Sequence, residues 1–279
     1  MGLSRTNDIM DDAVDRGVGV GAFNVISLES AEAIVRGAER AGTPVVMQIS
    51  ENCIRHHGAA DPVVVATLAL ARSAGVPVAV HLDHVESPDL VREGLLLGVQ
   101  SVMFDGSRLP DEDNVAATRA VVRECRSQGV AVEAELGEVG GKAGSSAHAP
   151  GVRTDPTQAA EFVRSTGVDA LAVAVGSSHA MTRRDTVLDE DLIQRLRAAV
   201  PVPLVLHGSS GVDDAGIRSA VRAGMTKINV STHLNTRFTA GLRRHLADHP
   251  DVVDPRRYLA RAREEMSEAV THLLSVIAG

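Results

Sequence analysis

The feature that most constrains the fold of this 279-residue chain is a regular alternation of short apolar runs with longer amphipathic stretches. The apolar runs, most of them rich in valine, occupy residues 18–23, 44–49, 76–82, 101–104, 130–136, 170–175, 203–206 and 227–230. Runs of this length and composition are typical of buried strands. The sequence therefore predicts eight strands spread over the whole chain.

The stretches between these runs carry apolar residues at helical spacing. They cover residues 30–41, 62–74, 88–97, 113–127, 157–166, 189–200 and 213–223, and two further helices follow the last strand, one to about residue 249 and one at about 255–277. Several begin at an Asp, Ser or Thr that can cap a helix, and most end near a glycine. Strands that alternate with helices and have no linker between them indicate one α/β domain with a parallel sheet, here residues 1–279. Eight such units favour a closed (β/α)₈ barrel, a TIM barrel, with an additional C-terminal helix.

An open, doubly wound sheet is the alternative architecture. Such a sheet usually has a glycine-rich fingerprint after its first strand, and Gly21-Ala22-Phe23-Asn24 is not one. The segment at about 137–155 is rich in Gly, Ser and Ala and is long for a connection inside a compact domain. Because it follows a predicted barrel strand, we expect it to be a mobile active-site loop.

Composition and charge exclude several classes of function. The formal net charge is −8, no long basic run is present, and aromatic residues make up only 2% of the chain, so nucleic-acid binding is disfavoured. The cysteines, Cys53 and Cys125, form no CxxC motif and suggest no disulfide framework. The first 15 residues are acidic and no apolar run could span a bilayer, which predicts a cytoplasmic protein that does not insert into a membrane. A small anionic substrate remains compatible with this composition.

Polar residues stand at or just beyond the carboxyl end of almost every predicted strand. They are Asn24, Ser50, Asp83 with His84, Asp105, Glu135, His179, His207 and Asn229. Each one alone could be a helix cap or an ordinary buried polar residue. In a parallel barrel, however, the carboxyl ends of the strands carry the chemistry, so the set as a whole predicts an active site.

Three of these residues, His84, His179 and His207, follow the third, sixth and seventh strands and could converge over one barrel mouth. Three imidazoles suit Zn²⁺ with one coordination position open for substrate. His81 is a competing ligand. Because side chains alternate along a strand, His81 and Asp83 share a face, while His84 is expected just past the strand's end. Spacing alone does not decide between His81 and His84.

The last two strands are followed by residues suited to an anion. One loop reads His207-Gly208-Ser209-Ser210-Gly211, and the other Asn229-Val230-Ser231-Thr232. Glycines allow close backbone approach, and the hydroxyl groups lie near helix N-termini, whose dipoles favour negative charge. These two loops are also where barrels commonly bind phosphate. Ordinary helix capping is the alternative, and the neighbouring histidine favours phosphate.

At these residues the chain resembles the class II ketose-bisphosphate aldolases, of the tagatose-bisphosphate and fructose-bisphosphate type. The matching segments run in order along the barrel: residues 22–24, 81–84, 101–107, 132–137, 171–179, 206–211 and 227–232. The resemblance implies a zinc-dependent aldolase that reversibly cleaves a ketose phosphate into dihydroxyacetone phosphate, or a similar donor, and an aldehyde. It also implies a homodimer or homotetramer, and it is compatible with a bound monovalent cation.

The resemblance assigns a role to each candidate residue. It implies that His84, His179 and His207 hold the zinc ion, with Asp105 and Glu135 orienting them or binding an alternate metal. Asp83 would be the acid or base at the aldehyde-derived oxygen, and Asn229 would contact the enediolate. Ser50 would face the aldehyde. The phosphate would be held by Gly208, Ser210, Ser231 and Thr232 and by the stretch that includes Ala180 and Arg183.

Two departures from the family pattern concern the substrate. The family carries a proton-abstracting acid shortly after a Gly-Gly pair, whereas here Gly140-Gly141 is followed by Lys142, Ala143 and Gly144, and Glu138 is the nearest acid. Ala180 replaces the usual glycine after the sixth-strand histidine, and Arg183 stands where some relatives have a phosphate-contacting lysine. The alternatives are a non-catalytic structural subunit and a zinc-dependent barrel hydrolase. A Schiff-base aldolase is disfavoured, because neither of the two lysines, Lys142 and Lys227, has a suitable setting.

Overall fold

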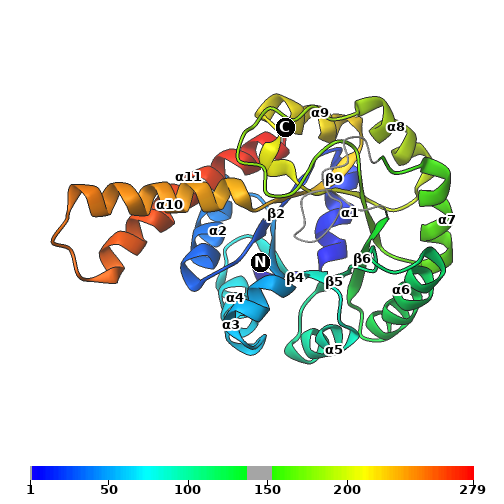
Figure 1. Cartoon of the computed structure of the whole chain (residues 1–279), viewed down its shortest axis with the longest axis horizontal. Coiled ribbons are helices and arrows are strands. Elements are labelled where there is room, and N and C mark those ends of the chain that lie inside the picture. Colours follow the sequence, from blue (N-terminus) through cyan, green and yellow to red (C-terminus); the bar gives the residue numbers. More distant parts are fainter. Residues whose placement is uncertain (1, 137–152) are drawn as a thin grey trace.

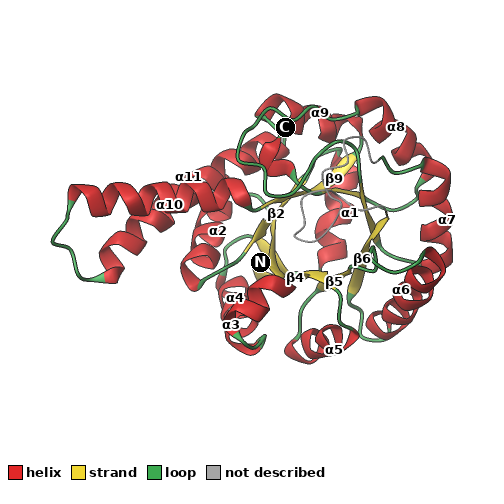
Figure 2. Ribbon diagram, in the orientation of Figure 1, coloured by secondary structure: helices red, strands yellow, loops and turns green. Residues whose placement is uncertain are grey.

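The computed structural model describes residues 2–136 and 153–279, which form a closed barrel of parallel strands ringed by helices (Figures 1 and 2). Consecutive strands pair in parallel around the ring, and the first and last of them, β2 and β9, also pair, which closes the barrel. The predicted (β/α)₈ barrel is confirmed. The barrel strands are β2 (Val20–Asn24), β3 (Val45–Ser50), β4 (Pro77–Val85), β5 (Ser101–Phe104), β6 (Ala131–Leu136), β7 (Ala170–Val173), β8 (Leu204–Leu206) and β9 (Met225–Val230).

The helices of the outer ring pack their apolar faces against the outward side chains of the strands. Those predicted from the sequence lie within two residues of their expected bounds. Side-chain caps begin several of them, as at Ser27, Ser87 and Asp213, and left-handed glycines end several, as at Gly42 and Gly98. The ring consists of α2 (Leu28–Ala41), α3 (Glu51–His57), α4 (Asp61–Ser73), α5 (Pro88–Leu97), α6 (Asp111–Arg126), α7 (Pro156–Thr166), α8 (Glu190–Ala199) and α9 (Asp214–Ala223).

Four elements were not expected from the sequence: β1 (Gly2–Leu3), α1 (Thr6–Arg16), α3 and the short 3₁₀ helix η1 (Ser209–Gly211). The short β1 pairs with β4. Helix α1 lies across one end of the barrel, where Ile9, Met10 and Ala13 pack against residues of β2, β3 and β4 that point inwards. The amino end of the barrel is thereby closed, and the carboxyl end is left to hold a site.

The last two helices, α10 (Thr232–Asp248) and α11 (Pro255–Ile277), form a hairpin that extends beyond the ring of helices (Figure 1). The chain returns along α11 to pack on α2. The predicted C-terminal helix at 255–277 is confirmed. Between the two helices, the buried carboxylate of Glu265 pairs with Arg237, Arg244 and Arg261. Among the described residues, no helix has the length and apolar character needed to cross a membrane.

The predicted active-site loop, at about 137–155, falls mostly outside the described residues, as do Glu138, Lys142 and Ala143. Its last part is placed. Thr154 donates its hydroxyl to the carbonyl of Leu136 at the end of β6, and it exchanges two further hydrogen bonds with Ala174 beyond β7. The chain therefore leaves and re-enters the barrel beside two neighbouring strands.

Candidate active site

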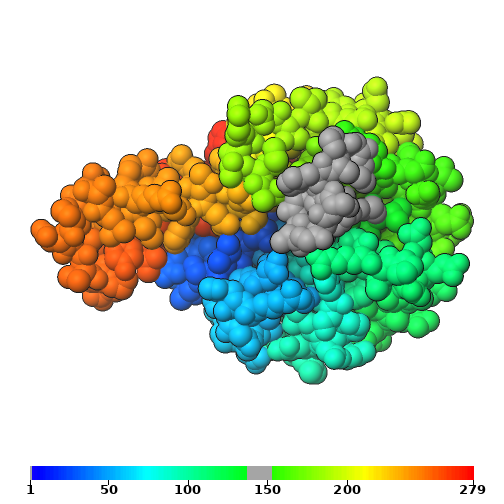
Figure 3. Space-filling model, viewed as in Figure 1, coloured from blue at the N-terminus to red at the C-terminus, as the bar shows by residue number. Residues whose placement is uncertain are grey.

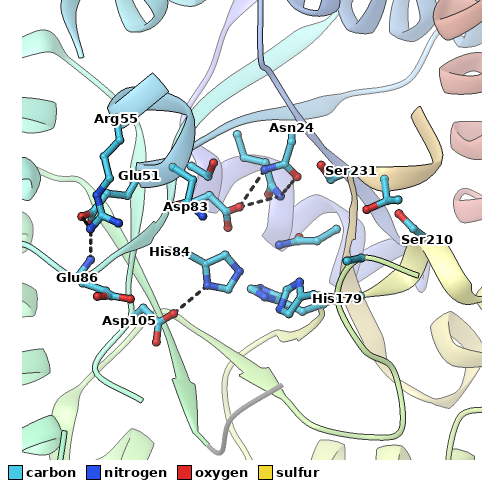
Figure 4. Close-up of a pocket in the computed structure, with 18 of the residues that line it drawn as sticks. Asn24, Glu51, Arg55, Asp83, His84, Glu86, Asp105, His179, Ser210 and Ser231 are labelled. Atoms are coloured by element: carbon cyan, nitrogen blue, oxygen red, sulfur yellow. Dashed lines mark hydrogen bonds and ion pairs between the residues drawn. The ribbon is translucent and has the colours of Figure 1, made fainter. Parts of the chain in front are cut away.

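A pocket of about 500 Å³ opens at the carboxyl ends of the strands. Its described lining includes all the site residues predicted from the sequence except Glu135 and Arg183. Figure 4 shows that these side chains arrive from opposite sides of the barrel, with Ser210 and Ser231 on one side, Glu51 and Arg55 on the other, and His84 and Asp83 between them. The space-filling view shows the molecule from the same side as Figure 1, with the α10–α11 hairpin projecting beyond the barrel (Figure 3).

Three histidines and a glutamate form a compact group at the bottom of this pocket. One potential ligand atom from each of His84, His179, His207 and Glu135 lies within 4.8 Å of all the others. The three imidazole rings stand edge to face, with centroids 4.7 to 5.6 Å apart. Three nitrogen donors with a carboxylate beside them match the ligand types that Zn²⁺ prefers. The residues present therefore fit a divalent transition metal.

The position of His84 departs from the expectation that it follows the strand. Strand β4 continues to Val85, and adjacent residues on a regular strand would point to opposite faces. His84 instead adopts a left-handed φ of 50°, and the pairing of β4 with β5 shifts register between Leu82 and Val85. This local bulge allows Asp83 and His84, consecutive in the sequence, to line the same pocket.

His81, the competing ligand, lies deeper in the barrel and is not part of the metal-ligand group among the described residues. Its Nδ1 is 2.7 Å from the hydroxyl of Ser101, which in turn lies 2.7 Å from the hydroxyl of Thr6 on α1. Burial, reinforced by the positive charge of Lys227, holds the pKa of His81 well below its ordinary value. His81 is therefore a neutral member of the barrel interior.

Carboxylates orient two of the three histidines. Asp105 Oδ2 lies 3.0 Å from His84 Nδ1, while its Oδ1 accepts hydrogen bonds from the backbone and hydroxyl of Ser107. Glu133 Oε1 lies 3.1 Å from His207 Nε2. A histidine that donates one ring N–H to a carboxylate is fixed in the tautomer whose other nitrogen can bind a metal. On His207 that other nitrogen, Nδ1, faces Glu135 at 3.6 Å.

Glu133 is itself held by Lys227, a pair that the sequence analysis missed. Lys227 Nζ donates to Glu133 Oε2 at 2.7 Å, and both side chains are buried. This contact engages Lys227 in an ion pair, in agreement with the expectation that it is not a Schiff-base residue. Alternation along β6 places Glu133 on the inward face with Glu135, and this pattern could have identified Glu133 as a residue of the barrel interior.

Asp83 presents one carboxylate oxygen to the protein and one to the pocket. Its Oδ2 accepts from Asn24 Nδ2 at 3.0 Å and from Gln48 Nε2 at 3.4 Å, whereas its buried Oδ1 has no hydrogen-bond partner. Burial alone would raise the pKa of Asp83. The charges of the neighbouring histidines and Lys227, with the hydrogen bond from Asn24, outweigh burial and lower it. Asp83 is therefore ionised at neutral pH, with a lone pair available to a substrate hydroxyl.

One side of the pocket, which we call the hydroxyl side, is formed by Gly208, Ser210, Ser231 and Thr232. Gly208 has a φ of 67°, and a Cβ there would come within 2.5 Å of the carbonyl oxygen of Ser178, so only glycine fits. Ser231 is the N-cap of the 17-residue helix α10, and its side chain makes no capping hydrogen bond. A long helix that begins at a pocket, surrounded by hydroxyl groups, favours an anion there.

The opposite side, which we call the paired-charge side, consists of Glu51, Arg55, Glu86 and Arg108. Glu51 pairs with Arg55 on α3, and Arg108 Nη1 lies 3.3 Å from Glu86 Oε1. The backbone N–H of Glu86 donates to Glu51 Oε2 at 2.7 Å, which joins the two pairs (Figure 4). The sequence analysis did not identify this side, because its residues lie in α3 and in the loops after β4 and β5.

Of the two further residues expected near the phosphate, Ala180 lines the pocket and Arg183 does not. Ala180 lines the pocket beside His179 and adopts a left-handed φ of 59°, a conformation that glycine adopts more readily. Arg183 is outside the pocket lining, its side chain is 85% exposed, and its Nε lies 3.4 Å from Asp185. Arg183 therefore does not support the phosphate assignment.

The fold and this pocket define a TIM-barrel enzyme with a candidate metal centre at the carboxyl ends of its strands. A family model described as fructose-bisphosphate aldolase class-II matches residues 4–278, and the chain belongs to this family. It is similar to the YdjI aldolase from Escherichia coli K12, with 30% identity and a TM-score of 0.86 over 99% of this chain and 97% of that one. It is also similar to a putative fructose-1,6-biphosphate aldolase from Coccidioides immitis, with 28% identity and a TM-score of 0.86 over 98% and 96% of the two chains.

A third solved structure, fructose-bisphosphate aldolase from Campylobacter jejuni, shares the fold, with 21% identity and a TM-score of 0.82 over 99% of this chain and 95% of that one. Family membership makes this chain a carbon–carbon lyase that catalyses aldol cleavage and condensation. This result favours an aldolase over the hydrolase and the non-catalytic subunit that the sequence left open.

Proposed function

We propose that this aldolase depends on zinc and reversibly joins dihydroxyacetone phosphate, or a similar phosphorylated ketone, to an aldehyde. The observation that carries the proposal is that His84, His179 and His207 converge within one pocket. The hydroxyl side of the same pocket lies at the N-terminus of α10. The family's description as fructose-bisphosphate aldolase class-II supports a phosphorylated donor.

The three histidines would hold the ion, with Glu135 as a further ligand or an alternate one and Asp105 orienting His84. When bound, a divalent ion supplies Lewis-acid stabilisation for the negative charge that develops on the donor's ketone oxygen. The chain supplies the geometry. Glu133 and Lys227 hold His207 from below, and the bulge in β4 turns His84 into the pocket.

The phosphate of the donor would lie on the hydroxyl side. Ser210, Ser231 and Thr232 can donate hydroxyl hydrogen bonds, and the absence of a side chain at Gly208 lets the phosphate approach the backbone. Asn229 also lines the pocket, and both polar atoms of its amide are buried without a hydrogen-bond partner. We assign Asn229 to the oxygens of the donor, which would complete its hydrogen bonding.

Asp83 would handle the proton on the aldehyde-derived oxygen. In condensation, a base takes a C–H proton from the donor, and we propose Glu138, the nearest loop acid in the sequence, for this role. The donor carbon then bonds to the aldehyde carbon, and the aldehyde oxygen takes up a proton from the acid form of Asp83. In cleavage, ionised Asp83 removes that hydroxyl proton, the carbon–carbon bond breaks, the aldehyde leaves, and the donor carbon takes its proton back from the acid form of the base. Asn24 and Gln48 hold the carboxylate in place. Ser50 lines the pocket next to Asp83 and would face the aldehyde.

The test is condensation of dihydroxyacetone phosphate with glycolaldehyde or glyceraldehyde, followed by NMR detection of the new carbon–carbon bond. We expect product with the zinc-loaded protein, no product after chelation, and recovery after zinc alone is restored. Product formation at an undiminished rate in the metal-stripped protein would rule out the zinc requirement. Absence of product and of donor proton exchange in the zinc-loaded protein would rule out the donor.

The resemblance also predicts a homodimer or homotetramer, and we retain this as part of the proposal. Light scattering coupled to size-exclusion chromatography measures it directly. A mass of about 29.3 kDa, that of one chain, at micromolar concentration would contradict it.

A further inference from the structure

The charged residues of the pocket are distributed unevenly. Among its described lining residues, the hydroxyl side has no charged side chain, whereas the paired-charge side has two glutamates and two arginines. Asp83 and Asp105 lie between the two sides, near the histidines. A substrate that spans the pocket would thus contact uncharged hydroxyl groups at one end, and both carboxylates and guanidinium groups at the other.

The arginines of the paired-charge side are already neutralised by carboxylates. Arg55 pairs with Glu51, Arg108 pairs with Glu86, and the two pairs are joined by the hydrogen bond from the Glu86 backbone to Glu51. Glu51 is buried and cannot move away without losing that hydrogen bond. The guanidinium groups are about half exposed or more, with side-chain exposures of 63% for Arg55 and 53% for Arg108. They therefore present donors to the pocket without a surplus of positive charge.

This arrangement disfavours a second phosphate at the paired-charge side. A dianion there would lie beside Glu51 and Glu86, and the only guanidinium groups of the described lining are paired with them. Hydroxyl groups meet no such penalty. Each hydroxyl can donate to a carboxylate and accept from a guanidinium, so adjacent ion pairs offer complementary partners to a chain of hydroxyls.

We propose that the aldehyde substrate is an uncharged hydroxyaldehyde whose distal hydroxyl groups bind between the Glu51–Arg55 and Glu86–Arg108 pairs. The inference rests on the proposed function, since it takes the hydroxyl side as the donor phosphate site. It assigns a new role to these four residues, which is recognition of the acceptor. The condensation product is then a ketose with one phosphate, at the donor end.

The first experiment compares two acceptors that differ only in a terminal phosphate, D-glyceraldehyde and D-glyceraldehyde 3-phosphate, with dihydroxyacetone phosphate as donor. The measured quantity is kcat/KM, corrected for the fraction of free aldehyde. We expect kcat/KM to be at least about tenfold higher for the uncharged acceptor. A factor of this size corresponds to roughly one repulsive contact between the phosphate and a carboxylate in a partly screened site. An equal or higher kcat/KM for the phosphorylated acceptor would overturn the proposal. Erythrose and erythrose 4-phosphate provide a second pair with one more hydroxyl.

The second experiment changes the charge balance of the side itself. Glu86→Gln keeps the shape of the side chain but removes one negative charge and releases Arg108. We expect the ratio of the two kcat/KM values to shift towards the phosphorylated acceptor by about threefold to tenfold. Glu124→Gln is the matched control, because Glu124 also pairs with an arginine, Arg92, but lies outside the pocket. An unchanged ratio in Glu86→Gln would contradict the assignment of this side.

Exchange of the donor's C–H proton with deuterated water, measured without any aldehyde, separates the two proposals. If exchange occurs and the phosphorylated acceptor is preferred, only the acceptor inference fails. If no exchange and no condensation occur in the zinc-loaded protein, the proposed function fails and this inference fails with it. Exchange together with a preference for the uncharged acceptor supports both.

Discussion

The interior of the barrel has two levels that differ in how their polar groups are satisfied. At the deeper level, Lys227 and Glu133 form a buried ion pair that continues to His207, although His81 Nε2 is buried there without a hydrogen-bond partner. At the mouth, Asp83 Oδ1, Gln48 Oε1 and both polar atoms of the Asn229 amide are buried without hydrogen-bond partners. Buried polar atoms normally have hydrogen-bond partners. The Lys227–Glu133 pair follows this rule, whereas the four atoms at the mouth do not.

Backbone conformation shows the same contrast. Within the described residues, the non-glycine residues with a positive φ are His84 and Ala180, and both line the pocket. Strain and unsatisfied polar groups persist where the surrounding structure enforces them, and they cluster at functional sites. We infer that the mouth is completed by its substrate and that the deeper level supports it. Changes at the mouth should therefore alter turnover, and changes below should alter stability.

The largest expected effect is on turnover, from Asp83→Asn at the mouth. Asparagine keeps the size of the side chain and can still accept from Asn24, but it cannot take up or deliver the proton. General acid–base catalysis typically contributes 10²- to 10⁴-fold, so we expect kcat for condensation to fall by about that factor. Thermal unfolding should change little. Asp213→Asn, at a helix cap outside the pocket, is the control that should retain full activity.

Lys227→Met tests the deeper level. The substitution leaves the carboxylate of Glu133 buried without its counter-charge, and breaking a buried pair in this way costs about 3 to 5 kcal/mol of stability. Urea denaturation should show this loss. The double variant Lys227→Met with Glu133→Gln should recover a large part of it, because no buried charge then remains. A loss of activity in Lys227→Met without a loss of stability would remove the distinction between the two levels.

Thr232→Val addresses the hydroxyl side of the mouth. The two side chains have similar shapes, so the change removes mainly one hydroxyl group from the proposed phosphate site. Hydrogen bonds to charged groups contribute about 1.5 to 3 kcal/mol, which corresponds to an increase of roughly ten- to hundredfold in KM for the phosphorylated donor. Thr236→Val, one turn further along α10, provides the comparison. Equal KM values in the two variants would place the phosphate elsewhere.

The smallest effect is expected from Ala180→Gly, which relieves a left-handed alanine. Glycine adopts this φ at little cost but gains entropy in the unfolded chain, so the free energy of unfolding should rise by no more than about 1 kcal/mol. Ala198→Gly, in the exposed part of α8, should instead lower it by about 0.5 to 1 kcal/mol. A clear loss of stability in Ala180→Gly would show that this residue is not strained.

The barrel could be predicted from the sequence because its signals are local. Each strand is a short apolar run, and helices such as α9 begin at a capping Asp and end at a glycine. Helix α1 shows where this approach failed. Ile9, Met10 and Ala13 do have helical spacing, but several aspartates surround them, so the segment is too polar overall for three apolar residues to indicate a buried helix. Helix α3 is only seven residues long and carries little periodicity.

The site could be predicted only in part, because its geometry depends on contacts between distant segments. The rule that strand ends carry the polar residues identified the histidines and Asp83. Alternation could not choose between His81 and His84, because the bulge in β4 breaks the alternation where the choice is made. Lys227 and Glu133 are 94 positions apart, so alternation along β6 can show that Glu133 points inwards but cannot show that Lys227 is its partner. The position of the loop acid lies outside the described residues.

The central claim, that three histidines at the barrel mouth hold the ion on which the chemistry depends, is tested most directly by a zinc titration. Zinc is added to metal-stripped protein while exchange of the C–H proton of dihydroxyacetone phosphate with deuterated water is followed by NMR. The account predicts that exchange rises with added zinc and saturates at about one ion per chain. In folded His84→Ala, His179→Ala and His207→Ala variants, both stoichiometric zinc binding and exchange should be lost. Full exchange without metal, or full zinc occupancy in all three variants, would contradict the account.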